Sequence, residues 1–132
     1  MDQAFRILIA DRNRNVRNFL RRELLREGYE VILAGEGREL LRLVNGGHSP
    51  DILILDPDIP TELTKAELIK LLHFHHPAFP IVIHTLLGDE YDYAEMPGVA
   101  VCLEKGEDTA LLKKVVADVI RKCYPPRHTS QI

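Results

Sequence analysis

The sequence is poor in cysteine and has no tryptophan. Its two cysteines, Cys102 and Cys123, do not form a CxxC pair. Neither a disulfide framework nor a cysteine-based zinc site is therefore expected, and a reducing, cytoplasmic compartment is predicted.

Long hydrophobic runs and an excess of positive charge are also missing. No segment approaches the roughly 20 apolar residues of a membrane-spanning helix, and the first apolar run turns acidic at once, unlike a signal peptide. The 17 Lys and Arg residues stand against 20 Asp and Glu residues, for a net charge of −3 at pH 7. We expect a soluble domain that neither enters a membrane nor binds nucleic acid directly.

What is present is an alternation of short apolar runs with amphipathic stretches. The runs are rich in Ile, Val and Leu and do not alternate strictly with polar residues, which is typical of strands covered on both faces of a parallel sheet. They occupy residues 6–11, 30–34, 51–56, 81–85 and 100–105. Five strands joined by helices predict an α/β fold with a five-stranded, doubly wound parallel sheet.

The stretches between the runs carry helix signals of unequal strength. Gly28 stands where the first helix would stop, and Thr64 precedes Glu67 by the spacing of a capping box. Residues 86–98 are short and polar and contain Gly and Pro, so any helix there is expected to be brief or irregular.

Polar residues end four of the five predicted strands. They are Asp11, Asp56, Thr85 and Lys105 on the first, third, fourth and fifth strands. Because ligands of such sheets bind beyond the carboxyl ends of the strands, we expect these four side chains to converge. Lys105 would then pair with Asp56, whose burial alone would cost several kcal/mol.

The chemistry of these groups suits phosphoryl transfer. A carboxylate can act as a nucleophile toward a phosphoryl group. The transfer needs a lysine and a divalent metal to neutralise charge that develops on the phosphoryl oxygens. Carboxylate oxygens together with water suit Mg²⁺.

The motifs ILIAD, DILILDPDIP, IVIHT and VCLEKG, in this order, resemble the receiver domain of bacterial two-component response regulators. The resemblance implies a (βα)5, flavodoxin-like three-layer sandwich. It places a receiver domain at residues 1–124 and leaves residues 125–132 as a tail or truncated linker.

The resemblance also implies a role for each site residue. Asp56 would be the phosphoacceptor, Thr85 the switch hydroxyl and Lys105 the lysine that contacts the phosphoryl group. Mg²⁺ would be held by Asp11, Asp56 and the backbone carbonyl of Asp58.

The implied partners are a sensor histidine kinase or phosphotransfer protein, which donates the phosphoryl group, and a downstream protein or effector domain. A homodimer is left open. The domain would catalyse only its own phosphorylation and dephosphorylation, so it is not expected to be an enzyme in the usual sense.

Four residues depart from the family pattern. Arg12 replaces the second residue of the acidic pair, so Mg²⁺ binding is expected to be weakened or abolished unless Arg12 turns to solvent. Leu86 replaces a small residue and would narrow the site. Gly106 replaces a proline, which favours a trans bond after the lysine or a bend at glycine. Cys102 replaces the switch aromatic residue and is interpreted as a core cysteine.

Two alternatives remain open. One is a pseudo-receiver, an interaction module in which Arg12 holds Asp56 in a fixed ion pair and no phosphorylation occurs. The other is a flavin- or nucleotide-binding protein, which the first loop does not support because it lacks a glycine-rich phosphate cradle.

Histidines invite two further interpretations. His84, inside a predicted strand, is interpreted as a hydrogen-bonded core histidine. His73, His75 and His76 precede a proline at a predicted helix end. There they are expected to interact favourably with the helix dipole and not to form a metal site.

Overall fold

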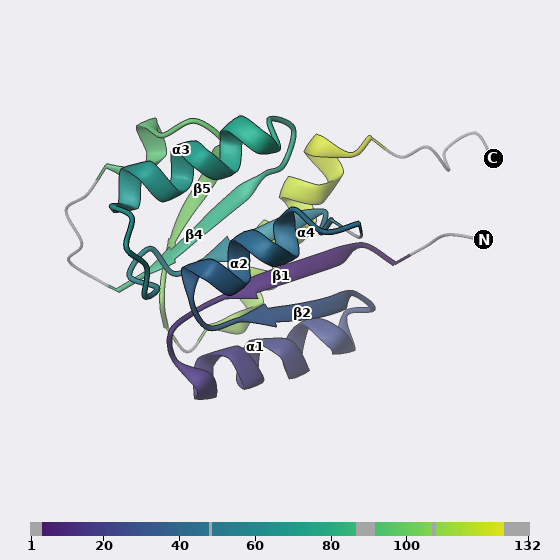
Figure 1. The fold of residues 1–132 in the computed structure, drawn as a ribbon. Helices are drawn as coiled ribbons and strands as arrows, with labels where there is room; N and C mark the ends of the chain where they lie inside the picture. Colours follow the sequence, from purple (N-terminus) through teal and green to yellow (C-terminus); the bar gives the residue numbers. More distant parts are fainter. Residues whose placement is uncertain (1–3, 48, 87–91, 107, 126–132) are drawn as a thin grey trace.

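The computed structural model describes residues 4–47, 49–86, 92–106 and 108–125. Its strands form one parallel sheet in the order β2-β1-β3-β4-β5 (Figure 1). The strands are β1 (Arg6–Ala10), β2 (Glu30–Ala34), β3 (Ile52–Leu55), β4 (Ile81–Thr85) and β5 (Val99–Glu104). The helices are α1 (Arg14–Arg26), α2 (Gly37–Val44), α3 (Lys65–His75), α4 (Thr109–Cys123) and the 3-10 helix η1 (Tyr93–Glu95). The predicted five-stranded, doubly wound α/β fold is confirmed.

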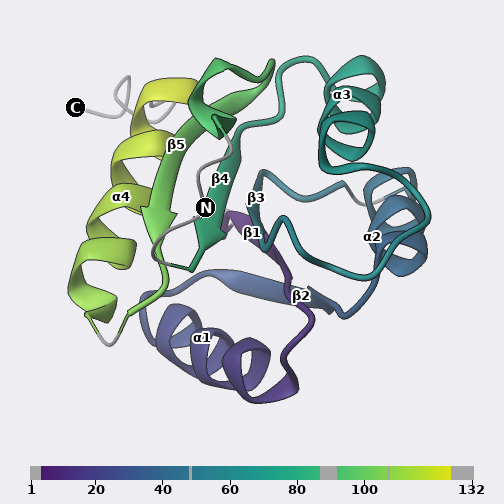
Figure 2. The same ribbon diagram turned by 90° about the vertical axis from the view of Figure 1, so that its left-hand side faces the viewer.

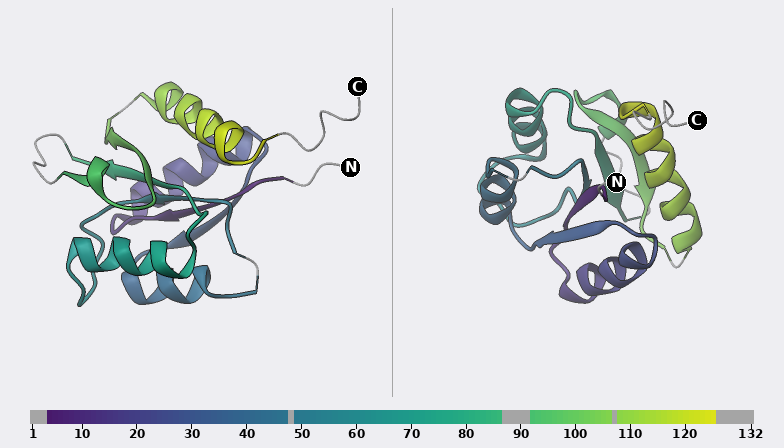
Figure 3. Two further views of the ribbon diagram at one scale, coloured as in Figure 1. Left: turned by 90° about the horizontal axis from the view of Figure 1, so that it is seen from above. Right: turned by 90° about the vertical axis from the view of Figure 1, so that its right-hand side faces the viewer.

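The helices cover both faces of the sheet. Helices α1 and α4 lie on one face and α2 and α3 on the other (Figures 2 and 3). Each face of the sheet has its own hydrophobic core, and successive residues of β3 point into one core and then the other. Leu53 packs on the side of α2 and α3, whereas Ile54 packs on the side of α1 and α4. Full burial of each such side chain contributes about 1.5–3 kcal/mol, so both layers are held to the central strands.

Local signals set the limits of the helices. Glu67 N–H donates to Thr64 Oγ1 at 3.0 Å and Thr64 N–H donates to Glu67 Oε1 at 2.8 Å, which is the predicted capping box at the start of α3. Gly28 follows α1 with a φ of +92°, a conformation that glycine adopts without steric cost. Among the described residues, no helix combines the length and apolarity needed to cross a membrane.

The fifth strand differs from the prediction. We expected it to be covered on both faces, but β5 is an edge strand whose Val101 and Leu103 face the α4 side while Ala100, Cys102 and Glu104 are exposed. The described residues before it, 92–98, form only the short helix η1, as the weak signal there predicted. This turn leaves the outer face of β5 open, so the interpretation of Cys102 as a core cysteine was wrong.

Candidate functional site

Two buried carboxylates lie where the order of the strands reverses. From β1 the chain first moves outward to β2 and then returns past β1 to β3, so β1 and β3 flank the switch point at which such sheets bind ligands. Asp11 follows β1 and Asp56 follows β3, and each is 2% exposed. Asp56 N–H donates to the Ala10 carbonyl at 2.8 Å, which locks the two strand ends together.

Lys105 reaches both carboxylates from the end of β5. Its Nζ lies 2.9 Å from Asp11 Oδ2 and 3.3 Å from Asp56 Oδ2. Its backbone N–H donates to the Thr85 carbonyl at 2.6 Å, which fixes the start of the side chain at the sheet edge. The structure therefore brings Asp11, Asp56 and Lys105 together, as the topology argument expects.

Backbone donors complete the surroundings of the two carboxylates. Asp58 N–H donates to Asp56 Oδ1 at 3.0 Å and Arg12 N–H to Asp56 Oδ2 at 3.4 Å, while Asn13 N–H donates to Asp11 Oδ1 at 2.8 Å. Hydrogen bonds to an ionised acceptor are stronger than neutral ones. Each carboxylate thus accepts backbone hydrogen bonds in addition to its contact with Lys105.

Arg12 faces the site. Its Nε lies 3.5 Å from Asp56 Oδ2, and one terminal nitrogen lies 3.9 Å from Asp58 Oδ2. Its side chain remains 44% exposed. Of the two interpretations of this residue, turned to solvent or turned to the acidic group, the structure shows the second.

The remaining predicted residues lie at the same edge. Thr85 ends β4 and is buried, and Leu86 after it is exposed at the rim. The bond between Lys105 and Gly106 is trans, since no cis peptide occurs among the described residues. The switch role of Thr85, the narrowing by Leu86 and the metal contact of the Asp58 carbonyl stay predictions.

The structure adds two residues that our sequence reasoning missed, Lys65 and Tyr93. Lys65, the first residue of α3, places its Nζ 3.0 Å from Asp58 Oδ1 and 5.8 Å from the ring centroid of Tyr93. The hydrogen bond to Tyr93, followed by that to Asp58, raises the pKa of Lys65. A lysine directly after the Thr64 helix cap, where the loop that follows β3 ends, was the available signal for this contact.

His84 is buried, but its Nδ1 has no hydrogen-bond partner among the described residues. The expectation of a hydrogen-bonded core histidine was therefore wrong for this nitrogen. On the strand, His84 points to the side opposite to its neighbours and lines the space beside α1 and α4 with Leu20 and Leu112. Burial, and next the positive charge of Lys105, lower the pKa of His84 from its ordinary value of 6.5.

This lowered pKa predicts a pH dependence of stability. Below about pH 6.5 the unfolded chain binds a proton at His84 that the folded chain resists, so this residue lowers the free energy of unfolding as the pH falls toward its folded pKa. We expect the free energy of unfolding, measured with urea, to fall less steeply between about pH 7.5 and 5.5 in His84→Leu than in the wild type. His75→Leu, at an exposed position, serves as the control. Equal slopes in the wild type and His84→Leu would contradict the prediction.

A family model described as the response regulator receiver domain matches residues 7–124. The chain belongs to this family. It is 33% identical over 87 residues to the alkaline phosphatase synthesis transcriptional regulatory protein PhoP of Bacillus subtilis, a match that covers 66% of the chain and 35% of PhoP. It is 40% identical over 80 residues to the response regulator MprA of Mycolicibacterium vanbaalenii, covering 61% of the chain and 34% of MprA. The matches thus span about a third of the length of these curated relatives.

Solved receiver structures share the fold. The response regulator TrrA of Thermotoga maritima, crystallised in complex with Mg²⁺-BeF, matches with a TM-score of 0.76 and 26% identity, over 87% of this chain and 98% of that one. NtrX of Brucella abortus matches with a TM-score of 0.85 and 22% identity, over 97% of this chain and 30% of that one, which shows the fold alone.

The receiver site here does not suit a divalent metal as the residues stand. Each carboxylate that would bind the ion already has a cationic partner, because Asp11 contacts Lys105 and Asp56 contacts both Lys105 and Arg12. No cluster of three or more metal-ligating side chains was found among the described residues. The Asp11 and Asp56 carboxylates both contact Lys105, so their negative charge is already compensated.

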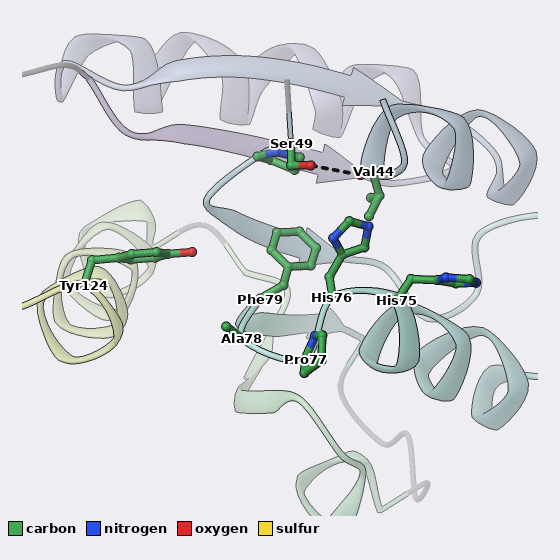
Figure 4. A pocket seen from close by; sticks show the side chains of 9 residues that line it. Val44, Ser49, His75, His76, Pro77, Ala78, Phe79 and Tyr124 are labelled. Atoms are coloured by element: carbon green, nitrogen blue, oxygen red, sulfur yellow. Dashed lines mark hydrogen bonds between the residues drawn. The ribbon is translucent and has the colours of Figure 1, made fainter. Parts of the chain in front are cut away.

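The receiver also has a pocket of about 280 Å³ at the opposite edge of the sheet (Figure 4). His75 and His76, which the sequence singled out, line it at the end of α3, with Phe79 and Tyr124. His76 Nε2 lies 3.1 Å from Asn45 Oδ1, and its ring packs against Phe79. These contacts give His76 a structural role beside the helix end.

Proposed function

We propose that this receiver domain accepts a phosphoryl group on Asp56 from a sensor histidine kinase or phosphotransfer protein, in the cytoplasm. The observation that carries the proposal is a buried carboxylate at the switch point of the sheet, in contact with a lysine and two backbone donors. Membership of the response regulator family supports it. The acyl phosphate would then signal to a downstream protein or effector domain.

The geometry supports a direct displacement. An oxygen of Asp56 bonds to the phosphorus while the bond from phosphorus to the donor's imidazole nitrogen breaks. The electron pair of that bond stays on the nitrogen, which takes up a proton. Little covalent help is needed from the protein, because such transfers depend on positioning and on neutralising the phosphoryl oxygens.

The neighbouring groups have separable tasks in this mechanism. The Lys105 ammonium group neutralises charge on the transferred group, and the Thr85 hydroxyl would hydrogen-bond a phosphoryl oxygen and shift with it. Attack by water at the phosphorus then returns free Asp56 and inorganic phosphate. The domain would thus act on its own side chain and not on a separate substrate.

The donor has an approach route beside Lys105. A pocket of about 270 Å³ opens between the start of α1 and the residues that follow β5, with Asn15, Phe19, Lys105 and Gly106 among its lining. Phe19 is an exposed aromatic side chain there. A helical partner that packs on Phe19 would carry its phosphorylated histidine toward Lys105 and Asp56.

The pseudo-receiver alternative rests on the ion pair of Arg12 with Asp56, and that pair exists. However, Lys105 contacts the same carboxylate, and Arg12 is nearly half exposed and can move. The family comparisons give this alternative no preference over an ordinary receiver.

The decisive test is incubation with acetyl phosphate and measurement of intact mass. We expect the wild type to gain the mass of one phosphoryl group and Asp56→Asn to gain none, because the amide is not a nucleophile of comparable strength. Asp92→Asn, an exposed change outside the site, serves as the matched control and should be modified normally. An unmodified wild type would rule out the proposed function, and modification of Asp56→Asn would place the phosphoryl group elsewhere.

A further inference from the structure

We infer that Arg12 is the resident cation of this site, so that Asp56 takes up a phosphoryl group, or a mimic of one, without Mg²⁺. This inference rests on the proposed function, since it concerns the same carboxylate. Its starting point is the direct contact of the Arg12 guanidinium with Asp56 Oδ2.

The charges of the site are already balanced. Three carboxylates and three side-chain cations are linked by contacts of 2.9 to 3.9 Å. The carboxylates belong to Asp11, Asp56 and Asp58, and the cations to Arg12, Lys65 and Lys105. An acid in place of Arg12 would change the sum from zero to −2, which is the charge that one divalent ion neutralises. Here the guanidinium has removed that deficit.

The geometry places two cationic groups, those of Lys105 and Arg12, beside one oxygen of Asp56. Both oxygens of Asp56 accept a backbone hydrogen bond, Oδ1 from Asp58 N–H and Oδ2 from Arg12 N–H. Only Oδ2 also contacts side-chain cations, at 3.3 Å from Lys105 Nζ and 3.5 Å from Arg12 Nε. Oδ2 is therefore the oxygen from which a bonded phosphoryl group would extend between an ammonium and a guanidinium group. The planar guanidinium can donate two parallel hydrogen bonds to such a group.

Exposure gives Arg12 the freedom that this role needs. Phosphorylation replaces one carboxylate charge with about −1.5 to −2 on the phosphoryl oxygens. The side chain of Arg12 is 44% exposed, while that of Lys105 is 14% exposed. Arg12 can thus move outward with the added group and stay in contact with it, while Lys105 remains between the two buried acids.

The test uses beryllofluoride and acetyl phosphate, each with Mg²⁺ and with EDTA in its place, on the 132-residue chain. Bound beryllofluoride is detected by fluorine NMR and phosphorylation by intact mass. We expect the wild type to bind and to be modified in EDTA at nearly the rate seen with Mg²⁺. Arg12→Gln should lose about 10²-fold in rate in EDTA, the usual cost of one lost donor to a developing oxyanion.

Charge reversal supplies the complementary arm. Arg12→Asp should bind Mg²⁺ in a titration followed by amide NMR shifts and should need Mg²⁺ for modification, whereas the wild type should do neither. Arg14→Asp makes the same change of charge two positions away, on the exposed start of α1, and should behave as the wild type. Circular dichroism confirms that each variant is folded.

The outcomes separate this inference from the proposed function. If EDTA abolishes modification of the wild type and Mg²⁺ restores it, the inference is overturned while the proposed function stands. If Arg12→Gln is modified in EDTA as fast as the wild type, Arg12 is not the cation and the inference fails. If the wild type is modified in neither medium, the proposed function fails and this inference fails with it.

Discussion

Lys105→Met is expected to lower the free energy of unfolding by about 3–5 kcal/mol, the cost of removing one partner from a buried ion pair. Lys105 is the cation in contact with both Asp11 and Asp56, each 2% exposed. Without it, two charged carboxylates face each other at a sheet edge where burial keeps most water away. The measurement is urea unfolding at neutral pH, followed by circular dichroism.

Two further variants show that the loss comes from the buried acids. Lys113→Met removes a lysine of the same size from a pair with Glu23 in which the two side chains are 24% and 16% exposed. Solvent screens this pair more than the contacts of Lys105 with the two buried acids, so the loss should be smaller. Asp11→Asn combined with Lys105→Met should recover part of the stability, because one of the two opposed charges is gone. Equal losses for Lys105→Met and Lys113→Met would show that water reaches the acids and that the site is not a buried one.

Tyr93→Ala is expected to lower the free energy of unfolding by about 3–5 kcal/mol, as for other aromatic residues deleted from a core. Tyr93 is 1% exposed although it lies in a 3-10 helix of three residues, and it packs in the core formed with α2 and α3. Its ring holds the described part of the segment before β5 against the sheet. Urea unfolding of the variant and the wild type measures the loss.

Tyr93→Phe isolates the hydroxyl group. The ring and its burial remain, so the expected loss is only about 1 kcal/mol, the usual net worth of one hydrogen bond. Because the hydrogen bond to Tyr93 is the largest cause of the raised pKa of Lys65, that pKa should fall toward its ordinary value in the variant. NMR titration of the Lys65 side chain tests this, and an unchanged pKa would assign the shift to Asp58 instead.

The fold could be predicted because its signals are local. Five apolar runs of strand length, a capping box at Thr64 and a glycine stop at Gly28 each act within a few residues of the chain. Parallel strands then bring their carboxyl ends to one edge by necessity. The closeness of Asp11, Asp56 and Lys105 follows from that rule alone.

Side-chain partners across the sheet could not be predicted in the same way. Cys102 was interpreted as a core residue because its run is apolar, yet only an adjacent helix would bury that face, and η1 is too short to do so. His84 was expected to find a partner, but the neighbouring layer offers its Nδ1 none among the described residues. Lys65 of α3 and Tyr93 of η1 meet although no spacing in the chain relates these two elements.

Residue order alone was enough to place two acids and a lysine at a single edge, because strand direction and connection rules leave few other arrangements. It could not say which way the Arg12 side chain turns. That outcome depends on which carboxylates lie within a few ångströms in the folded molecule, since electrostatic attraction falls with distance in space and is indifferent to separation along the chain.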